Sequence, residues 1–303
     1  MKYPRRSEKW EKRMLATLKE VLEKAEQGNY AVGAFNCTSL ESGMAIVETA
    51  EELNSPVILQ YADSHRHLIS IDVIGPIMLQ LATIAKVPVV VHLDHGASIE
   101  SCRHAVDMGF TSVMYDASAK PFEDNVAETR SVVEYAHERG ASVEAELGHI
   151  LTSKAGAAEG NGKSYTREEA YTDPEMAKEF IERTNVDALA IGFGTAHGIY
   201  TEKPVLDLNR IALIKSAKDI PYVMHGGSGL SEEEYRTAIH NGIRKINYYT
   251  YLSLAGGRGV MQYLEDKKDK DAIYFEDIAK AGITAMKADV KRAMKIFESD
   301  GKI

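Results

Sequence analysis

The amino-acid sequence predicts an α/β protein that folds as a single-domain (β/α)8 TIM barrel. Eight short runs rich in β-branched residues recur along the chain, and stretches with the apolar spacing of amphipathic helices separate them, such as 40–53 and 126–140. Strands that alternate with helices indicate βαβ units and a parallel sheet. A doubly wound sheet is the competing arrangement, but its usual glycine fingerprint does not follow the first run. Eight repeats therefore favour a barrel of about 250–270 residues.

Each predicted strand ends in a polar or glycine-containing turn. In chain order the strands are AVGAFN (31–36), PVILQY (56–61), PVVVHLD (88–94), TSVMYD (111–116), SVEAEL (142–147), VDALAIG (186–192), PYVMHG (221–226) and IRKIN (243–247). Three of them open with proline, at a position where a strand can spare its N–H group. Between the strands, Gly140 is predicted to cap one helix C-terminus and Asn54 with Ser55 to end another, while Ser231 is predicted to cap a helix N-terminus.

Three segments lie outside this repeat. Residues 1–13 are polar and are predicted to be an N-terminal extension, which leaves 14–303 for the barrel. Residues 148–166 are rich in glycine, serine and alanine and follow the fifth strand, so they form either a mobile loop over the strand ends or a tolerated surface insertion. The charged segment from 263 onward is predicted to be helical and structural.

The composition narrows the classes of partner. The 303 residues include 36 Lys and Arg against 45 Asp and Glu, a net charge of −9, which argues against a nucleic-acid surface. The sequence has no apolar run of the roughly 18–20 residues that a membrane helix needs, and no apolar block follows its basic start, so neither a membrane nor a secretory signal is expected. With only Cys37 and Cys102, we expect no disulfide framework and a cytoplasmic location.

Polar residues gather at the carboxyl ends of the predicted strands, where barrel enzymes build their active sites. These residues are Asn36, Gln60, Asp94, His95, Asp116, Glu144, Glu146, His197, His225 and Asn247. Random placement would rarely put polar residues at the same end of so many apolar strands. The pattern therefore predicts one site at this end of the barrel.

Three of these residues are histidines on different strands, each followed by a glycine: His95, His197 and His225. Three imidazoles that converge from separate strand ends leave a fourth position open, which is the arrangement of catalytic zinc. We interpret the other histidines as structural. Among those, His92 shares a strand face with Asp94 and is a candidate hydrogen-bond partner of the ligands.

Glycine-rich turns follow two of the three histidines. Gly198 comes after His197, and the run Gly226, Gly227, Ser228 and Gly229 comes after His225. Such turns expose backbone N–H groups to an anion, and the helix that begins after Ser231 adds the positive end of its dipole. A glycine-rich turn can also be no more than a tight connection. Two of them beside candidate metal ligands favour a phosphate group held next to the metal.

Seven motifs, in this order, resemble those of class II ketose-bisphosphate aldolases, the metal-dependent fructose- and tagatose-bisphosphate aldolases: YAVGAFN, HLDHG, DASAKPFEDN, VEAELG, GTAHGIY, HGGSGL and KINYYT. The resemblance covers roughly residues 14–300. It implies Zn²⁺ on the three histidines, Asp94 as the proton-transfer residue, a second cation position at Asp116 and Glu146, and a homodimer or homotetramer. The substrate contacts assigned here are Asn36, Gly198, Gly226, Gly227, Ser228, Asn247, Tyr248, Tyr249 and Thr250.

The chemistry of such an aldolase suits these residues. Zinc, as a Lewis acid, polarises the C2 carbonyl of a ketose phosphate and stabilises the enediolate left by C3–C4 cleavage. Asp94 would take the C4 hydroxyl proton during cleavage and return it during condensation. A separate residue must exchange a proton at the enediolate carbon. Glu159 is the candidate, because it is the only acid between Glu146 and Glu168 in the predicted mobile loop.

The sequence departs from the family where members bind the far phosphate of the substrate. They place an arginine before an Ala-Gly pair, whereas IYFEDIAKAG has Glu276 at about that point. A glutamate would repel a phosphate, so the substrate is expected to be a ketose 1-phosphate or an altered bisphosphate. Alternatively, another cation such as Arg258, His65 or His67 covers the far phosphate.

The predicted function is therefore reversible aldol cleavage of a ketose 1-phosphate or 1,6-bisphosphate, in carbohydrate metabolism such as glycolysis. The products are dihydroxyacetone phosphate and an aldehyde, which is glyceraldehyde 3-phosphate if the substrate is fructose or tagatose 1,6-bisphosphate. Three alternatives remain open: a sugar-phosphate epimerase on the same zinc barrel, a hydrolase on that barrel, and a non-catalytic aldolase-like subunit.

Overall fold

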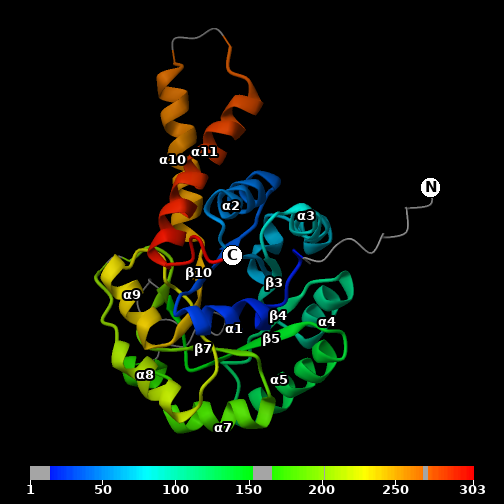
Figure 1. Cartoon of the computed structure of the whole chain (residues 1–303), viewed down its shortest axis with the longest axis vertical. Coiled ribbons are helices and arrows are strands. Elements are labelled where there is room, and N and C mark those ends of the chain that lie inside the picture. The colour runs from blue at the N-terminus through cyan, green and yellow to red at the C-terminus, as the bar shows by residue number, and fades with distance from the viewer. Residues whose placement is uncertain (1–13, 153–165, 201, 269–271) are drawn as a thin grey trace, which may run out of the picture.

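The computed structural model describes residues 14–152, 166–200, 202–268 and 272–303. Within these residues the chain forms a closed parallel barrel with the strand order β1-β10-β9-β7-β5-β4-β3-β2 (Figure 1). Its strands are β1 Val32–Asn36, β2 Val57–Ala62, β3 Val89–Gly96, β4 Ser112–Tyr115, β5 Ser142–Leu147, β7 Ala188–Ile191, β9 Tyr222–Met224 and β10 Ile243–Tyr248. Each of the eight predicted runs overlaps one of these strands, so the predicted barrel is confirmed.

One small sheet was not predicted. Strands β6 (Leu151–Thr152) and β8 (Ala196–His197) pair in parallel, outside the barrel sheet. Two residues per strand give no alternation that a sequence pattern can reveal. The pairing matters because β8 carries His197.

Helices surround the barrel, and most of those between consecutive strands form its outer layer. They are α1 Leu18–Gly28, α2 Leu40–Leu53, the 3₁₀ helix η1 Asp63–His67, α3 Ile71–Ile84, α4 Ile99–Met108, α5 Phe122–His137, α6 Arg167–Ala170, α7 Pro174–Thr184, α8 Leu208–Ala217, α9 Glu232–Asn241, α10 Thr250–Asp266 and α11 Phe275–Ile296. No helix of the described ranges combines the length and the apolar character needed to cross a membrane.

Local side-chain chemistry sets several of the helix ends. Ser231 caps α9 in a box with Glu234, and Asn54 ends α2 in the left-handed conformation, as predicted. The predicted cap at Gly140 is confirmed: Gly140 takes a φ of 74° just after α5, and the bonds from Gly140 N to His137 O and from Ala141 N to Ala136 O close the end of the helix. The charged segment from 263 is also more than one helix, because α10 ends at Asp266 and α11 begins at Phe275.

Helix α1 closes the amino-terminal end of the barrel (Figure 1). Its apolar face packs on inward-facing strand residues that alternate with outward-facing ones. This cluster comprises Leu18, Val21, Leu22 and Ala25 of α1 and Val32, Ala34, Ile58, Val90, Met114, Ala188, Ala190 and Val223 of the strands. Toward the carboxyl ends of the strands, the inward-facing side chains become polar. One end of the barrel is therefore an apolar plug, and the other end is free to build a site.

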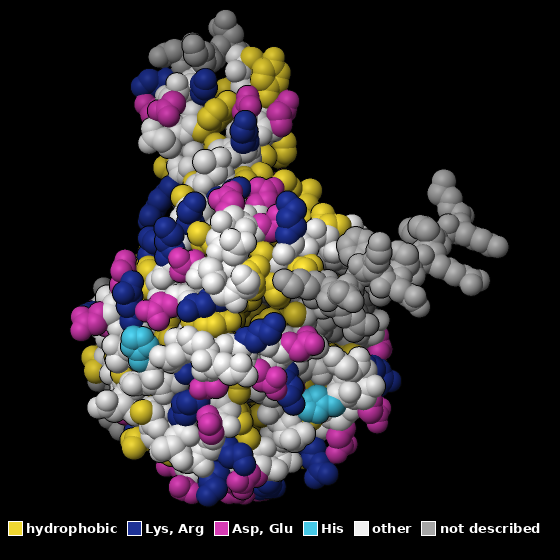
Figure 2. Space-filling view, in the orientation of Figure 1, with side chains coloured by type: hydrophobic (Ala, Val, Ile, Leu, Met, Phe, Trp, Pro, Cys, Tyr) yellow, Lys and Arg dark blue, Asp and Glu magenta, His cyan; other side chains and the backbone are white. Residues whose placement is uncertain are grey.

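Helices α10 and α11 form an antiparallel hairpin that projects from the barrel (Figure 1). Helix α11 also packs along α2, which fixes the base of the hairpin. Hydrophobic side chains lie among charged ones on its surface (Figure 2), including Met261, Tyr274 and Phe275, of which Phe275 is 77% exposed. The predicted tail is thus helical, as expected, but it does not cover the barrel as the other helices do.

Candidate active site

An irregularity in β3 delivers two neighbouring residues to the site. In a regular strand Asp94 and His95 would point to opposite faces. The register between β3 and β4 shifts between Leu93 and Gly96, and His95 takes a left-handed φ of 47°. Gly96 permits this path, because a Cβ there would lie 2.7 Å from the carbonyl oxygen of Met114.

The three predicted zinc ligands converge in the structure. His95 Nε2 lies 2.9 Å from His225 Nδ1, and one ring nitrogen from each of His95, His197 and His225 falls within 4.8 Å of the others. Two nitrogens bound to one tetrahedral zinc at about 2.0–2.1 Å lie about 3.3 Å apart, so the donor set fits this ion. The three histidines come from three different strand ends: His95 lies in β3, His197 lies in β8, and His225 follows the last residue of β9.

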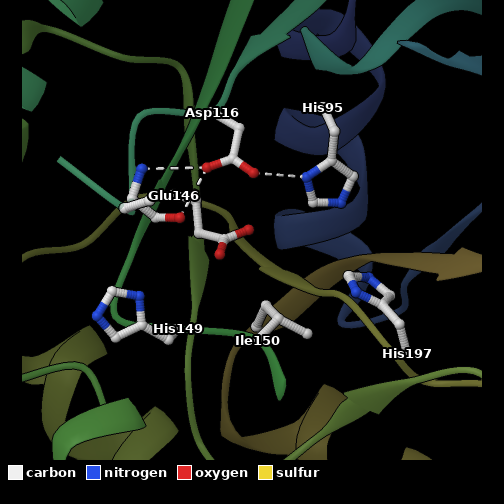
Figure 3. Close-up of a pocket in the computed structure, with 8 residues that line it drawn as sticks. His95, Asp116, Glu146, His149, Ile150 and His197 are labelled. Carbon is white, nitrogen blue, oxygen red and sulfur yellow. Dashed lines mark hydrogen bonds and ion pairs between the residues drawn. The ribbon is translucent and has the colours of Figure 1, made fainter. Parts of the chain in front are cut away.

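The predicted second cation position adjoins the first. His95, Asp116 and Glu146 also place one donor atom each within 4.8 Å of one another. His95 Nδ1 lies 2.8 Å from Asp116 Oδ2, and the other oxygen of Asp116 accepts bonds from the backbone N–H and hydroxyl of Ser118 (Figure 3). A small pocket opens between these groups, lined by His95, Asp116, Ser118, Ala119, Glu146, His149, Ile150 and His197. His95 is shared by both donor sets.

Asp94 is held by side-chain amides from three strands. Asn247 Nδ2 donates to Asp94 Oδ1 at 2.9 Å, while Gln60 Nε2 and Asn36 Nδ2 donate to Oδ2 at 3.2 and 3.4 Å. Gln60 also donates to Asn36 Oδ1 at 2.9 Å, which fixes the orientation of both amides. Asp94 is 4% exposed. The cage keeps the carboxylate oxygens in place beside the histidines.

The charges of the site shift its pKa values in different directions. Burial raises the pKa of Asp94, but the neighbouring His95 and His225 outweigh it and lower the value to about 2. Burial lowers the pKa of His95, yet the carboxylates of Asp94 and Asp116 raise it above its ordinary range. For His225, burial and the neighbouring His95 lower the pKa. Asp94 is therefore a carboxylate at neutral pH, as a proton acceptor must be.

The two glycine-rich turns lie against each other. A Cβ on Gly226 would fall 2.6 Å from the backbone carbonyl of Ala196, so only glycine allows this approach. Tyr200 joins the turns: its hydroxyl accepts from Ala196 N at 2.9 Å and donates to Gly226 O at 2.8 Å. The structure thus brings Gly198, Gly226, Gly227 and Ser228 into one region. Ser228 is 4% exposed.

The residues after β10 divide between the site and the outer layer. Asn247 faces inward onto Asp94, and Thr250 begins α10. The Tyr248 side chain does not face the site, contrary to our prediction. It packs on Phe35 and Phe297, and its hydroxyl accepts from Arg292, because strand alternation turns it outward. The ring of Tyr249 lies 4.6 Å from that of His65, at the rim.

Two further predicted residues are not brought to the site. Glu159 lies outside the described residues. Glu276 stands in the first turn of α11, at the outer end of the projecting hairpin (Figure 1). Within a single chain it is therefore not next to the strand ends, and the repulsion we expected does not arise there. Arg258 lies in α10 of the same hairpin.

The sequence reasoning missed several residues around the site. Lys245 is fully buried inside the barrel, where its ammonium meets Glu144. A lysine two positions before Asn247, on the same face of a short strand, is the signal that could have found it. Ser118, His149 and Ile150 line the pocket but lie in turns, where no periodicity points inward.

The barrel, the three converging histidines and the adjoining carboxylates define a metal-dependent barrel enzyme. Comparison with known proteins gives the family: the model of class-II fructose-bisphosphate aldolases matches residues 16–302. The chain belongs to this family, whose members are generally metal-dependent, and it is a carbon–carbon lyase.

Relatives and solved structures agree. The fructose-bisphosphate aldolase of Geobacillus stearothermophilus is 40% identical over 293 residues, which cover 95% of this chain and 98% of the relative. That of Staphylococcus aureus strain Mu50 is 40% identical over 261 residues, 84% of this chain and 88% of the relative. Among solved structures, the YdjI aldolase of Escherichia coli K12 is 34% identical with a TM-score of 0.82, over 95% of this chain and 99% of that one. A putative fructose-1,6-biphosphate aldolase from Coccidioides immitis is 27% identical with a TM-score of 0.80, over 94% and 97%.

Proposed function

We propose that the chain catalyses reversible aldol cleavage of a ketose 1-phosphate or 1,6-bisphosphate with Zn²⁺ held by His95, His197 and His225. The products are dihydroxyacetone phosphate and an aldehyde. The observation that carries the proposal is the convergence of three imidazole nitrogens beside a carboxylate that three amides hold. When bound, the metal supplies a Lewis acid for the carbonyl of the substrate.

Asp94 moves the proton in this proposal. Its carboxylate is ionised and held beside the histidines, so in cleavage it accepts the C4 hydroxyl proton as the C3–C4 bond breaks. In condensation it returns the same proton to the new hydroxyl group. Asn36, Gln60 and Asn247 keep its oxygens oriented through their amide bonds. Asn36 and Asn247 are also assigned contacts with the substrate. The second proton transfer, at the carbon of dihydroxyacetone phosphate, stays assigned to Glu159.

The glycine turns bind the C1 phosphate. The donors lie in one region: the backbone N–H groups of Gly198, Gly226 and Gly227, and the Ser228 hydroxyl. The remaining phosphate contacts are assigned to Tyr249 and to the N-terminus of α10 at Thr250, which follow β10. A second cation is assigned to Asp116 and Glu146, whose donor atoms lie within 4.8 Å of each other and of a His95 nitrogen.

Several broader assignments accompany this function. The names of the relatives support a role in sugar-phosphate metabolism, including glycolysis. Cys37 and Cys102 are buried free thiols, which suits a cytoplasmic enzyme. We assign the chain to a homodimer or homotetramer, and residues 1–13 to an extension of the barrel domain 14–303.

The binding of the far phosphate is tested by comparing a substrate that has it with one that lacks it. Fructose 1-phosphate is expected to be cleaved with a kcat/KM within 100-fold of that for fructose 1,6-bisphosphate, because Glu276, which replaces the arginine of the family pattern and lies in the outer part of the hairpin, supplies no cation to the far phosphate. A preference of 100-fold or more for the bisphosphate, about 2.7 kcal/mol of transition-state binding, would contradict this. His65, which contacts Tyr249 at the rim, would then be the cation to substitute next.

The same assay tests the reaction class. Release of a triose phosphate distinguishes an aldolase from an epimerase, which would leave the carbon chain intact, and from a hydrolase, which would release inorganic phosphate. Metal analysis of the purified protein accompanies it. Activity that persists after complete removal of divalent metal would overturn the proposed mechanism.

A further inference from the structure

We propose that Glu144, neutralised by Lys245, is a positioning residue that sets which nitrogen of His225 faces the metal. This assignment rests on the proposed zinc site and deepens it. Glu144 and Lys245 lie one layer below the histidines, inside the barrel, and both are 0% exposed.

The first step is the bond between Glu144 and His225. His225 Nε2 lies 2.8 Å from Glu144 Oε1, while His225 Nδ1 faces His95 Nε2 at 2.9 Å. A carboxylate can only accept, so the Nε2 of His225 carries the proton and Nδ1 keeps a lone pair. The imidazole is therefore held with Nδ1 toward the position where the three nitrogens converge.

The second step is the charge of Lys245. Its Nζ lies 2.8 Å from Glu144 Oε2, so the two charges compensate each other where both side chains are fully buried. A carboxylate there without a counterion would carry a large desolvation cost. Lys245 is not placed to react with a substrate carbonyl, because it is sealed inside the barrel and bound to Glu144. Its function is to hold Glu144 in place below the site.

The third step concerns the other polar neighbours of Lys245, whose hydrogen bonds are consistent with the same arrangement of protons. Lys245 Nζ lies 3.5 Å from His92 Nε2, and His92 Nδ1 lies 2.8 Å from Ser112 Oγ. One proton arrangement satisfies all of these contacts. Lys245 forms an ion pair with Glu144 and donates to His92, His92 donates through Nδ1 to Ser112, and His225 donates to Glu144. His92 thus completes the layer that orients Glu144.

A comparison within the site supports the assignment. His95 is oriented in the same way, but by Asp116, and through the opposite nitrogen: Nδ1 meets the carboxylate and Nε2 faces His225. Ligand histidines in metal sites usually donate their other nitrogen to such an oxygen acceptor. Glu144 supplies for His225 what Asp116 supplies for His95.

The test is the affinity for Zn²⁺ of the full chain, measured by competition with a chromophoric chelator. Glu144→Gln is expected to weaken binding about 10- to 100-fold. The double variant Glu144→Gln/Lys245→Met removes both charges together, so it leaves no uncompensated charge and is expected to fold with the same loss of affinity. The visible spectrum of the Co²⁺-substituted protein is expected to change in both variants, because the orientation of one ligand changes.

Glu26→Gln is the matched control. Arg244, the neighbour of Lys245, points to the outer face of β10, and its Nε lies 3.1 Å from Glu26 Oε2. Removing that carboxylate also breaks an ion pair with an almost fully buried cation, but away from the site. This variant is expected to melt at a lower temperature with unchanged Zn²⁺ affinity and Co²⁺ spectrum.

The outcomes separate this inference from the function on which it rests. Wild-type protein that binds Zn²⁺ tightly, with both Glu144 variants equal to it in affinity and spectrum, would overturn the role of Glu144 alone. Equal loss of affinity in Glu26→Gln would also overturn it, because any buried charge defect would then suffice. Wild-type protein without Zn²⁺ affinity would overturn both the metal site and this assignment.

Discussion

Asp94 and His95 are neighbours in the chain but have different partners, and the left-handed φ of His95 makes this possible. Asp94 meets three amides, whereas His95 meets the carboxylate of Asp116 and the ring of His225. A non-glycine residue in this conformation costs on the order of 1–3 kcal/mol. The surrounding hydrogen bonds hold the strain, which places the proposed proton acceptor next to a proposed metal ligand in the sequence.

The first residue-scale prediction concerns Asp94→Asn. The amide keeps the shape of the side chain but cannot accept the hydroxyl proton, so kcat/KM for cleavage is expected to fall about 10²- to 10⁴-fold. The bound zinc, measured by atomic emission, is expected to remain at the wild-type level. Asp187→Asn serves as control: Asp187 accepts from Val143 N and contacts His137 away from the site, so that variant should lose stability rather than activity. Activity of Asp94→Asn within threefold of wild type would contradict the assigned role.

At the scale of elements, the site is assembled from turns that fit only because particular glycines are present. Gly226 has a φ of 63° and lies against the backbone of Ala196, and the hydroxyl of Tyr200 bridges the two turns. The anion site we assign here is therefore one unit, although its halves are about 30 residues apart in sequence. A change in one turn is expected to disturb the other.

Gly226→Ala tests this coupling. The new Cβ would clash with the Ala196 backbone in a conformation that alanine disfavours, so we expect a loss of stability above about 1 kcal/mol and a raised KM for the ketose phosphate. Gly257→Ala is the control, since Gly257 lies in α10 with open space around it and gains about 0.5–1 kcal/mol from helix propensity. The measurements are urea unfolding and steady-state kinetics. An unchanged KM in a folded Gly226→Ala variant would argue against the phosphate site.

Elements were also where sequence reasoning succeeded and failed most clearly. Strands such as β3 were predictable because β-branched runs with period two are long enough to recognise. The β6–β8 pair was not, because a two-residue strand such as Ala196–His197 has no period. Most of the predicted site residues stand where a polar residue follows an apolar run, but Lys245 was overlooked although it faces inward two positions before Asn247. Tyr248 was misassigned because we extended the motif past Asn247 without applying the alternation that turns it outward.

In the whole molecule, metal binding is expected to be coupled to the stability of the fold. The donor atoms of the histidine set come from strands distributed around the barrel, so a bound ion ties distant parts of the sequence together. An ion that binds only the folded chain stabilises it by RT ln(1 + [L]/Kd), about 2.7 kcal/mol at 100 times the Kd.

Metal removal is therefore expected to lower the melting temperature by several degrees, and readdition of Zn²⁺ is expected to restore it. Differential scanning calorimetry of the chelated, dialysed and reloaded protein measures this. The variant His225→Ala, which removes one of the three nitrogens, should lose most of the zinc-dependent shift. A melting temperature of the wild-type protein that does not respond to Zn²⁺ would contradict the proposed site.

Helix α1 has a consequence for the order in which the chain is made. It is translated before the barrel, yet its apolar face packs against a barrel whose last strand, β10, begins at Ile243. At about 5–20 residues per second, translation from Gly28 to Ile243 takes on the order of 10–40 s. During that time Leu18, Val21 and Leu22 have no completed barrel to cover them. The apolar face of α1 therefore stays without its barrel partners until β10 has been translated, so its burial is a late step of folding during synthesis.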